Sequence, residues 1–238
     1  MRFDVKITPM KLLAFDASTE FLSIALRTEQ QTYKIDLKAG QTASQLILPQ
    51  IQTLLDDAQL ALTDLDGIAF GAGPGSFTGV RIACGVAQGL AFGANLPVVG
   101  VNVLMALAEA SGAERVIAAS DARMGEAYHS VFVRENDQWA EVHAAGVYKP
   151  DLVPAVDGDG WVGVGTAWNV HGEALHAQYA NQVASTLPEM TPMAEAILTL
   201  ATPVFERGEA LPASEAKPVY IRNRVALTSK EREQGLRL

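Results

Sequence analysis

The sequence predicts an α/β protein built from two similar halves, and three observations lead to this prediction. An apolar strand ending in Asp-Ala, a turn with a glutamate and a return strand occur twice, as LLAFDAS, Glu20, FLSIALR and as VIAASDAR, Glu126, AYHSVFVR. A second pair of similar segments follows in the same order, DGIAFGAG at 66–73 and DGWVGVGT at 159–166. Short apolar strands also alternate with segments of helical periodicity. Matching segments in matching order indicate an internal duplication.

The elements of the first half follow from apolar runs and their spacing. The first nine residues are interpreted as a leader, and Met10 is a possible second start. Unbroken or alternating apolar character predicts strands at residues 11–16, 21–27, 32–37, 67–71 and 97–101. Helical spacing predicts helices at 44–58 and 78–93, and Asn102 is expected to cap a third helix reaching about residue 110.

The pattern restarts in the second half. Strands are predicted at residues 116–121 and 127–134, and a C-terminal helix at 192–207. Thr191 is expected to cap that helix, with Pro192 at its first position. We therefore expect an N-terminal lobe at residues 10–112 and a C-terminal lobe at residues 113–238, with the C-terminal helix packing back and a basic tail following it.

Two tandem units of this kind are typical of the actin/sugar-kinase/chaperone-type (ASKHA) fold, whose lobes face a nucleotide across a cleft. Asp16 and Asp121 fall at the hairpin turns, and Gly163 and Gly165 could lie under an adenine. A nucleotide-dependent kinase is therefore one alternative. The turn at residues 16–20 lacks the glycine and lysine that such turns use, and aspartate is favoured in turns for its own chemistry. We expect vestigial nucleotide binding at most, and no cofactor.

Composition narrows the function further. The 238 residues carry a net charge of −9, whereas a protein that binds nucleic acid on its own usually needs a basic surface. The basic stretch of this chain is residues 222–238, which contain five Arg or Lys and two Glu. The single cysteine, Cys84, cannot form an intrachain disulfide, and the four histidines have no zinc-ligand spacing, which disfavours the alternative of a metallopeptidase. Without a run of ~18–20 apolar residues or a signal-peptide pattern, we expect a cytoplasmic protein outside the membrane.

The glycine-rich segment GAGPGSFTG at residues 71–79 fits none of the standard catalytic or phosphate-binding motifs. It lacks the last glycine of a dinucleotide fingerprint and the lysine of a P-loop. A nucleophile elbow would place glycines two residues on either side of Ser76, where Pro74 and Thr78 stand. Ser76 is therefore interpreted as a helix cap.

The helix after this segment is predicted to meet a second chain. It is apolar nearly all round and carries Gly85, Gly89 and Gly93 at four-residue spacing, where each glycine costs about 1 kcal/mol against alanine. Such a stripe permits close helix approach. The positive charge of Arg81 in the first turn interacts unfavourably with the helix dipole. A bound carboxylate would explain why an arginine stands at this position. The predicted interface residues are Leu46, Leu48, Ile51, Ser76, Phe77, Thr78, Arg81, Ile82, Gly85 and Gly89.

Segments of residues 10–224 closely resemble the TsaB (YeaZ) family: LLAFDASTE, SQLILPQI, DLDGIAFGAGPGSFTGVRIACGVAQGLA, PVVGVNVLMALA, DARMGEAY and PVYIR. The GPGSFTG string followed by Arg81 is the most specific of them, and the resemblance is patchy from residue 139 to 190. Many members carry His-Ser where this chain has Ala43-Ser44, so no histidine role is expected there.

The resemblance implies a non-catalytic subunit for threonylcarbamoyl transfer to the anticodon-adjacent adenosine of tRNA. In that family the chain pairs through its first-lobe helices with TsaD, a homologue that carries the metal and the active site, or with a second copy of itself. The ATPase TsaE and the adenylate-forming TsaC complete the system. The resemblance thus implies a homodimer in isolation, with tRNA reached only through the complex.

Overall fold

The computed structural model describes residues 10–222 and contains two five-stranded sheets. The first sheet has the order β3-β2-β1-β4-β5 and the second β10-β9-β6-β7-β8. Read from its other edge, the second sheet is β8-β7-β6-β9-β10, which repeats the first. In both sheets the first three strands along the chain pair antiparallel and the last two join in parallel. The predicted two-lobed α/β fold with an internal duplication is confirmed.

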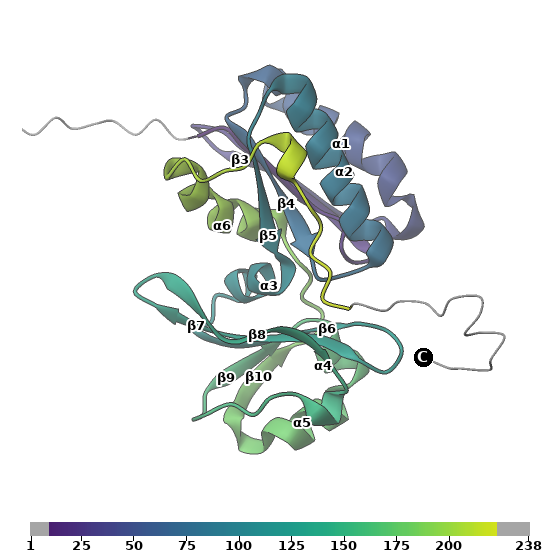
Figure 1. Ribbon diagram of the computed structural model, residues 1–238, viewed down its shortest axis with the longest axis vertical. Helices are drawn as coiled ribbons and strands as arrows, with labels where there is room; N and C mark the ends of the chain where they lie inside the picture. Colours follow the sequence, from purple (N-terminus) through teal and green to yellow (C-terminus); the bar gives the residue numbers. More distant parts are fainter. Residues whose placement is uncertain (1–9, 223–238) are drawn as a thin grey trace, which may run out of the picture.

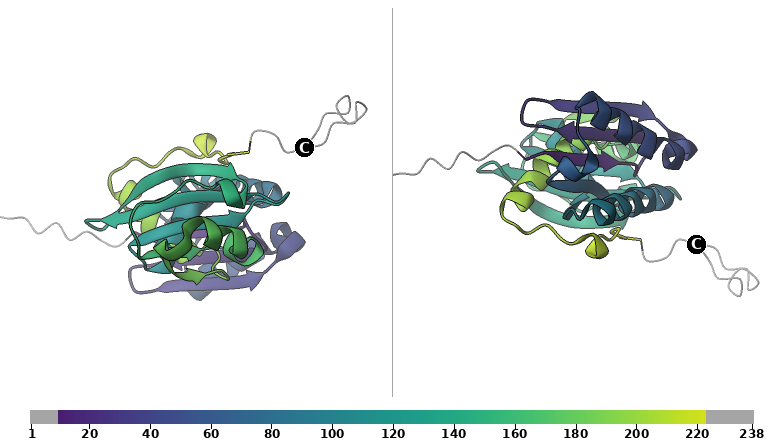
Figure 2. Two further views of the ribbon diagram at one scale, coloured as in Figure 1. Left: turned by 90° about the horizontal axis from the view of Figure 1, so that it is seen from below. Right: turned by 90° about the horizontal axis from the view of Figure 1, so that it is seen from above.

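The strands of the first sheet are β1 (Leu12–Asp16), β2 (Phe21–Arg27), β3 (Thr32–Lys38), β4 (Gly67–Gly73) and β5 (Val98–Asn102). Helices α1 (Ala43–Asp57) and α2 (Phe77–Ala94) lie side by side on its outer face, and α6 (Ala194–Glu206) covers the other face (Figures 1 and 2). Because α6 comes from the end of the chain, the first lobe is completed only after the second lobe has been made.

The start of α6 differs from the prediction. The helix begins at Ala194, and neither Thr191 nor Pro192 belongs to it. The Oγ of Ser23 on β2 accepts a hydrogen bond from the Ala194 amide at 2.8 Å, so a residue distant in sequence satisfies one of the free N–H groups at this helix end.

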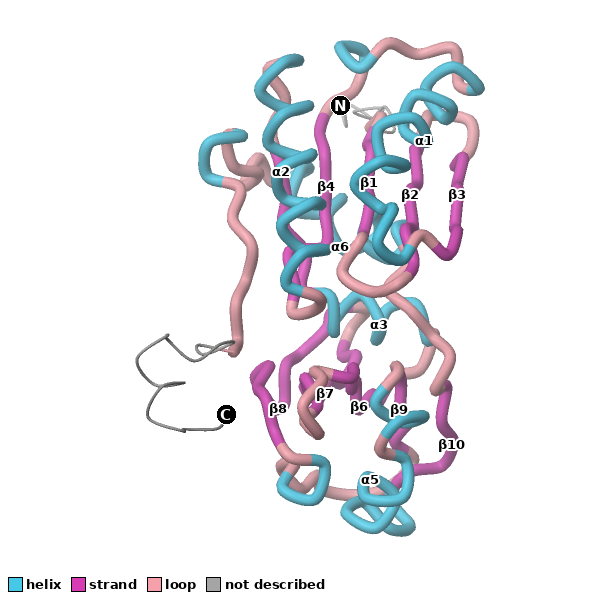
Figure 3. The backbone as a smooth tube through the Cα atoms, turned by 90° about the vertical axis from the view of Figure 1, so that its right-hand side faces the viewer, coloured by secondary structure: helices cyan, strands magenta, loops and turns pink. Residues whose placement is uncertain are grey.

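The second lobe contains β6 (Arg115–Asp121), β7 (Ala127–Glu135), β8 (Gln138–Tyr148), β9 (Trp161–Val164) and β10 (Val183–Leu187). Two short helices, α4 (Ala167–Val170) and α5 (Gly172–Tyr179), pack on the face away from the first lobe (Figure 1). The other face receives α3 (Val103–Ser111), which lies between the two sheets (Figure 3). Asn102 caps α3 as predicted, with its Oδ1 accepting from the Leu104 and Met105 amides.

A C-terminal segment, residues 211–222, connects the lobes a third time, and we call it the strap. Leu211 forms a β-bridge with Val98, and Ala213–Glu215 is a 3₁₀ turn. The strap then runs beside α2, where the Val219 amide donates to the Ala72 carbonyl at 2.7 Å (Figure 1). It ends at Arg222, whose guanidinium pairs with Glu126 in the second lobe.

Candidate partner-binding surface

The glycine-rich segment is shaped by its packing on the β1–β2 turn. The Ser76 amide donates to the Ser18 carbonyl at 2.7 Å, and the Ser76 Oγ accepts from the Gly79 amide, which confirms Ser76 as the cap of α2. A side chain at Gly79 would overlap the Ala17 carbonyl oxygen, and one at Gly75 would overlap Ser18. These two glycines therefore serve close backbone packing that holds the start of α2 against the turn.

We expect Gly79→Ala to destabilise the isolated protein. The added methyl group meets a backbone oxygen that has no free rotation, so overpacking should lower the free energy of unfolding by about 1–3 kcal/mol. Gly85→Ala is the matched control in the same helix, because the added methyl group meets no atom within 4 Å. Urea unfolding should place the control at or above the parent chain. Equal stability of the two variants would contradict the packing role of Gly79.

Asp16 ends β1 inside the protein, with only 1% of its surface exposed. Its Oδ1 accepts from the Ser18 amide at 2.9 Å and the Ser18 hydroxyl at 2.8 Å, which fixes the turn that the glycine-rich segment contacts. Its Oδ2 is buried without a hydrogen-bond partner among the described residues. Burial raises the pKa of Asp16 from 3.8 to about 6. A carboxylate enclosed in this way is placed to position the turn.

Asp16→Asn is expected to change how stability depends on pH. Because the folded pKa lies above the unfolded one, the folded state holds the proton more tightly, and Asp16 favours folding below pH 3.8. That contribution is lost as the pH rises through about 6, and a pKa of about 6 in place of 3.8 corresponds to roughly 3 kcal/mol.

Asparagine can accept the same Ser18 hydrogen bonds but does not ionise, so the variant should gain stability relative to the parent between pH 4 and 7. Unfolding free energies at several pH values measure this difference directly. A difference between the two chains that stays constant with pH would contradict the buried ionisation of Asp16.

The second hairpin turn places Asp121 in contact with other groups of the second lobe. Its Oδ1 accepts from the Arg123 amide at 2.9 Å, and its Oδ2 lies 3.2 Å from the Arg123 Nη1. The Nε2 of His171 is 3.6 Å from Oδ1. Asp121 therefore acts as a turn residue with local partners, which agrees with the ordinary turn chemistry of aspartate.

Gly163 and Gly165 do not provide an open adenine site. A side chain at Gly163 would overlap the indole of Trp168, whose Nε1 donates to the Ile117 carbonyl at 3.1 Å. Gly165 has a φ of +103° and lies against the Ala119 carbonyl. The indole thus fills the space beside Gly163, and both glycines are buried, so the expectation that they lie under a nucleotide base is corrected on that ground.

The metal-binding capacity of the described chain is limited. Within residues 10–222, no group of three or more His, Cys, Asp or Glu side chains could hold a metal ion. His129 is fully buried, and its Nε2 lies 2.6 Å from the Tyr179 hydroxyl, which itself donates to the Pro154 carbonyl. Because that hydroxyl proton is already used, the His129 Nε2–H is the donor to Tyr179. His129 is therefore a hydrogen-bonded core residue.

The two faces of α2 differ in what they contact. Val80, Ala83, Cys84, Ala87 and Ala91 are buried in the first lobe. On the opposite face the three glycines of the stripe are exposed, and a side chain added at any of them meets no atom within 4 Å. Packing among residues 10–222 therefore does not explain these glycines. The same two helices also expose large apolar side chains, namely Leu48 of α1 and Phe77 and Phe92 of α2.

The prediction of one interface residue, Ile51, is wrong. Ile51 is only 2% exposed and packs in the core beneath α1, on the inward stripe with Ile47, Leu54 and Leu55. It cannot contact a second chain. The other predicted interface residues are exposed or partly exposed, namely Leu46, Leu48, Ser76, Phe77, Thr78, Arg81, Ile82, Gly85 and Gly89.

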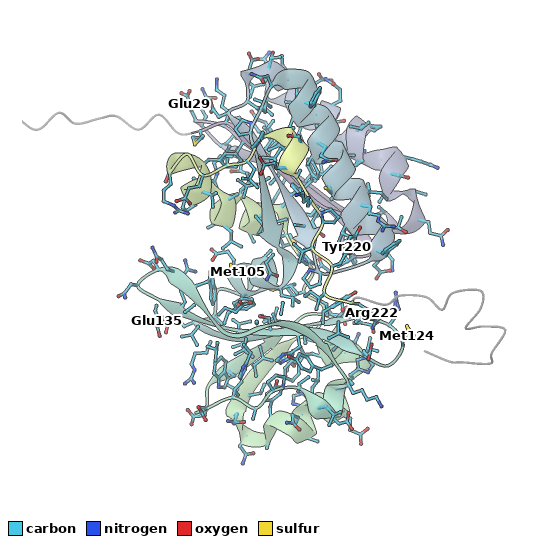
Figure 4. The ribbon with its side chains drawn as sticks, in the orientation of Figure 1. Glu29, Met105, Met124, Glu135, Tyr220 and Arg222 are labelled. Carbon is cyan, nitrogen blue, oxygen red and sulfur yellow. The ribbon has the colours of Figure 1, made fainter. Side chains whose placement is uncertain are left out.

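Residues outside the predicted set also form this surface. The Arg81 guanidinium lies 3.4 Å from the Phe77 ring centroid and 5.4 Å from that of Tyr220, and its Nε donates to the Tyr220 hydroxyl at 2.7 Å. Tyr220 and Arg222 extend along the strap toward Met124 at the junction of the lobes (Figure 4). Tyr220 stands in the segment PVYIR, which carries part of the family resemblance. That resemblance is the sequence feature from which a role of Tyr220 could have been predicted.

The composition of α2 also meets the length and hydropathy of a membrane span, with 18 residues and a mean hydropathy of 1.2. That is weak support for a span, because core helices of globular proteins have the same composition. The buried face of α2 packs on β4 and β1.

Comparison with known proteins gives concordant results. A profile of the family described as "TsaD: tRNA N6-adenosine threonylcarbamoyltransferase" matches residues 37–206. The tRNA threonylcarbamoyladenosine biosynthesis protein TsaB of Escherichia coli K12 is 39% identical over 226 residues, covering 91% of this chain and 96% of that protein. Its Haemophilus influenzae counterpart is 38% identical over 229 residues, covering 91% and 95%. The structure of YeaZ from Pseudomonas aeruginosa matches with a TM-score of 0.83 and 39% identity over 89% of this chain and 100% of that one.

Proposed function

The chain belongs to the TsaB family of tRNA threonylcarbamoyladenosine biosynthesis proteins, and from this premise we propose that it is a non-catalytic subunit that pairs with TsaD. TsaD would perform the threonylcarbamoyl transfer to the anticodon-adjacent adenosine. This chain would supply a surface that TsaD needs in order to be active.

The exposed glycine stripe of α2 is the observation that carries this proposal. A helix interior that accepts three glycines loses stability, and the part of the chain that the structure describes offers no neighbour that requires them. A second helix that approaches closely would make the stripe useful. Leu48 of α1 and Phe77 at the start of α2 are also exposed and add apolar area that a partner would remove from water.

The aspartates and glycines of the cleft support the non-catalytic part of the proposal. Asp16 is enclosed by protein, Asp121 is engaged with Arg123, and Trp168 occupies the space beside Gly163. A groove of about 590 Å³ lies between α3 and α6 and is lined by neither aspartate. We therefore propose that the chain needs no cofactor, and that neither a kinase-like nor a metallopeptidase-like activity resides in it.

The remaining expectations concern the assembly. We propose that TsaE joins the pair, that TsaC supplies the activated threonylcarbamoyl group, and that tRNA is reached through the complex in the cytoplasm. Titration of purified TsaD with this chain tests the pairing. Saturable binding at one surface is expected, and failure of the unmodified chain to bind TsaD would overturn the proposed function.

In isolation we expect a homodimer, because the unpaired face of α2 remains apolar when TsaD is absent. Light scattering over a dilution series should give twice the monomer mass at high concentration. Added TsaD should replace the homodimer with the heterodimer, since both use the same face. A mass that stays at the monomer value throughout would contradict this prediction.

A further inference from the structure

The strap lies where the proposed partner surface meets the second lobe. It packs directly on the glycine-rich segment: Val219 pairs with Ala72, and the cavity between the strap and the Pro74–Phe77 region is only about 20 Å³. At its end, Arg222 pairs with Glu126 in the turn between β6 and β7. The strap is thus held at both lobes, and its outward residues Val219 and Tyr220 remain exposed beside Phe77.

Arg81 is the charged group at the centre of this region. Its guanidinium stacks on Phe77 and contacts Tyr220, and its Nε is used by the Tyr220 hydroxyl. These contacts fix the orientation of an otherwise flexible side chain. In the described part of the chain no carboxylate lies within ion-pair distance of Arg81, so its Nη groups have no anionic partner there.

We propose that the footprint of the partner continues from α2 onto the strap, and that a carboxylate of the TsaD-type partner binds the Arg81 guanidinium. This inference rests on the proposed function. An arginine fixed by aromatic contacts loses little freedom on binding, and its planar fork matches a carboxylate with two parallel hydrogen bonds. Charge complementarity requires an anion, and continuity with the glycine stripe favours an acidic side chain of the protein partner over a free phosphate.

The experiment measures TsaD affinity by calorimetry for the full chain and for variants of this region. Arg81→Gln should weaken binding about tenfold or more, and Arg81→Glu should weaken it further by repulsion. Arg81→Lys keeps the charge but loses the fork, so an intermediate loss is expected. Tyr220→Phe keeps the ring and removes the hydroxyl that positions Nε, and should cost a few-fold. Arg207→Gln is the control, because Arg207 is an exposed arginine paired with Glu209 beyond α6.

Three results would overturn the inference. Arg81→Gln could bind TsaD within twofold of the unmodified chain, or Arg81→Glu could bind as tightly as Arg81→Gln. Inorganic phosphate could bind the unmodified chain but not Arg81→Gln and leave TsaD affinity unchanged, which would assign the guanidinium to a phosphate outside the partner footprint. The unmodified chain is measured alongside the variants. Its failure to bind TsaD would count against the proposed pairing itself, whereas normal binding by the variants would count against the role of Arg81 alone.

Discussion

Replacing Gly89 by leucine is expected to weaken TsaD binding about tenfold to a hundredfold without destabilising the monomeric chain. The leucine side chain would point into open space in the monomer, since no atom of the described residues lies within 4 Å of an added Cβ. Helix propensity should then raise the free energy of unfolding by somewhat less than the ~0.8–1 kcal/mol that separates glycine from alanine. In the complex the same side chain would meet a closely packed helix, where overpacking costs about 1–3 kcal/mol and each 1.4 kcal/mol is tenfold in affinity.

Calorimetric titration with TsaD and urea unfolding of the isolated chain, at a concentration low enough for it to be monomeric, separate these two effects. Gly172→Leu is the matched control, because Gly172 is also an open glycine at a helical position but lies on α5 in the second lobe. The control should bind TsaD normally. If Gly89→Leu unfolded early and still bound TsaD with unchanged affinity, the stripe would belong to the folding of the lobe, and the interface would have to lie elsewhere.

The second prediction with a large expected effect concerns His129 and the stability of the protein at low pH. Burial, together with the nearby His143, lowers the pKa of His129 from 6.5 to about 3. Because the folded pKa lies below the unfolded one, the unfolded state binds the proton first as the pH falls. His129 therefore supports folding above pH 6.5, and this support is lost progressively between pH 6.5 and about 3, to a total of roughly 5 kcal/mol.

His129→Gln should remove this dependence, because glutamine does not titrate and can still donate to the Tyr179 hydroxyl. The measurement is the difference in unfolding free energy between the two chains from pH 7 to pH 4. The parent should lose stability faster, in the opposite direction to the effect of Asp16 in the first lobe. Parallel curves would show that His129 does not stay neutral in the folded protein.

Local patterns in the sequence were sufficient to predict much of the fold. The restart of the strand-turn-strand pattern at residue 116 gave the second lobe, and the match of 159–166 to 66–73 corresponds to β9 and β4. Ser76 and Asn102 were identified as caps because the bonds they make lie within three residues. Each of these signals is carried by neighbouring residues.

Features that depend on distant contacts were missed. The start of α6 is set by Ser23, which is 171 residues away from Ala194. β8 and β10 carry only weak alternation, since both are edge strands with many half-exposed positions. Ile51 was assigned to the interface because the sequence alone does not show which apolar stripe of α1 faces the sheet. Tyr220 has a role only through Arg81, 139 residues earlier.

The central proposal, a subunit required for the reaction but without catalytic residues, is tested most directly by threonylcarbamoyl transfer to tRNA. The assay contains TsaD, TsaE and TsaC, with this chain omitted, unmodified, or carrying Asp16→Asn and Asp121→Asn together. We predict that omission abolishes modification and that the doubly substituted chain restores it to the level of the unmodified chain. A doubly substituted chain that binds TsaD with normal affinity yet fails to support modification would contradict the proposal, because a cleft aspartate would then take part in the chemistry.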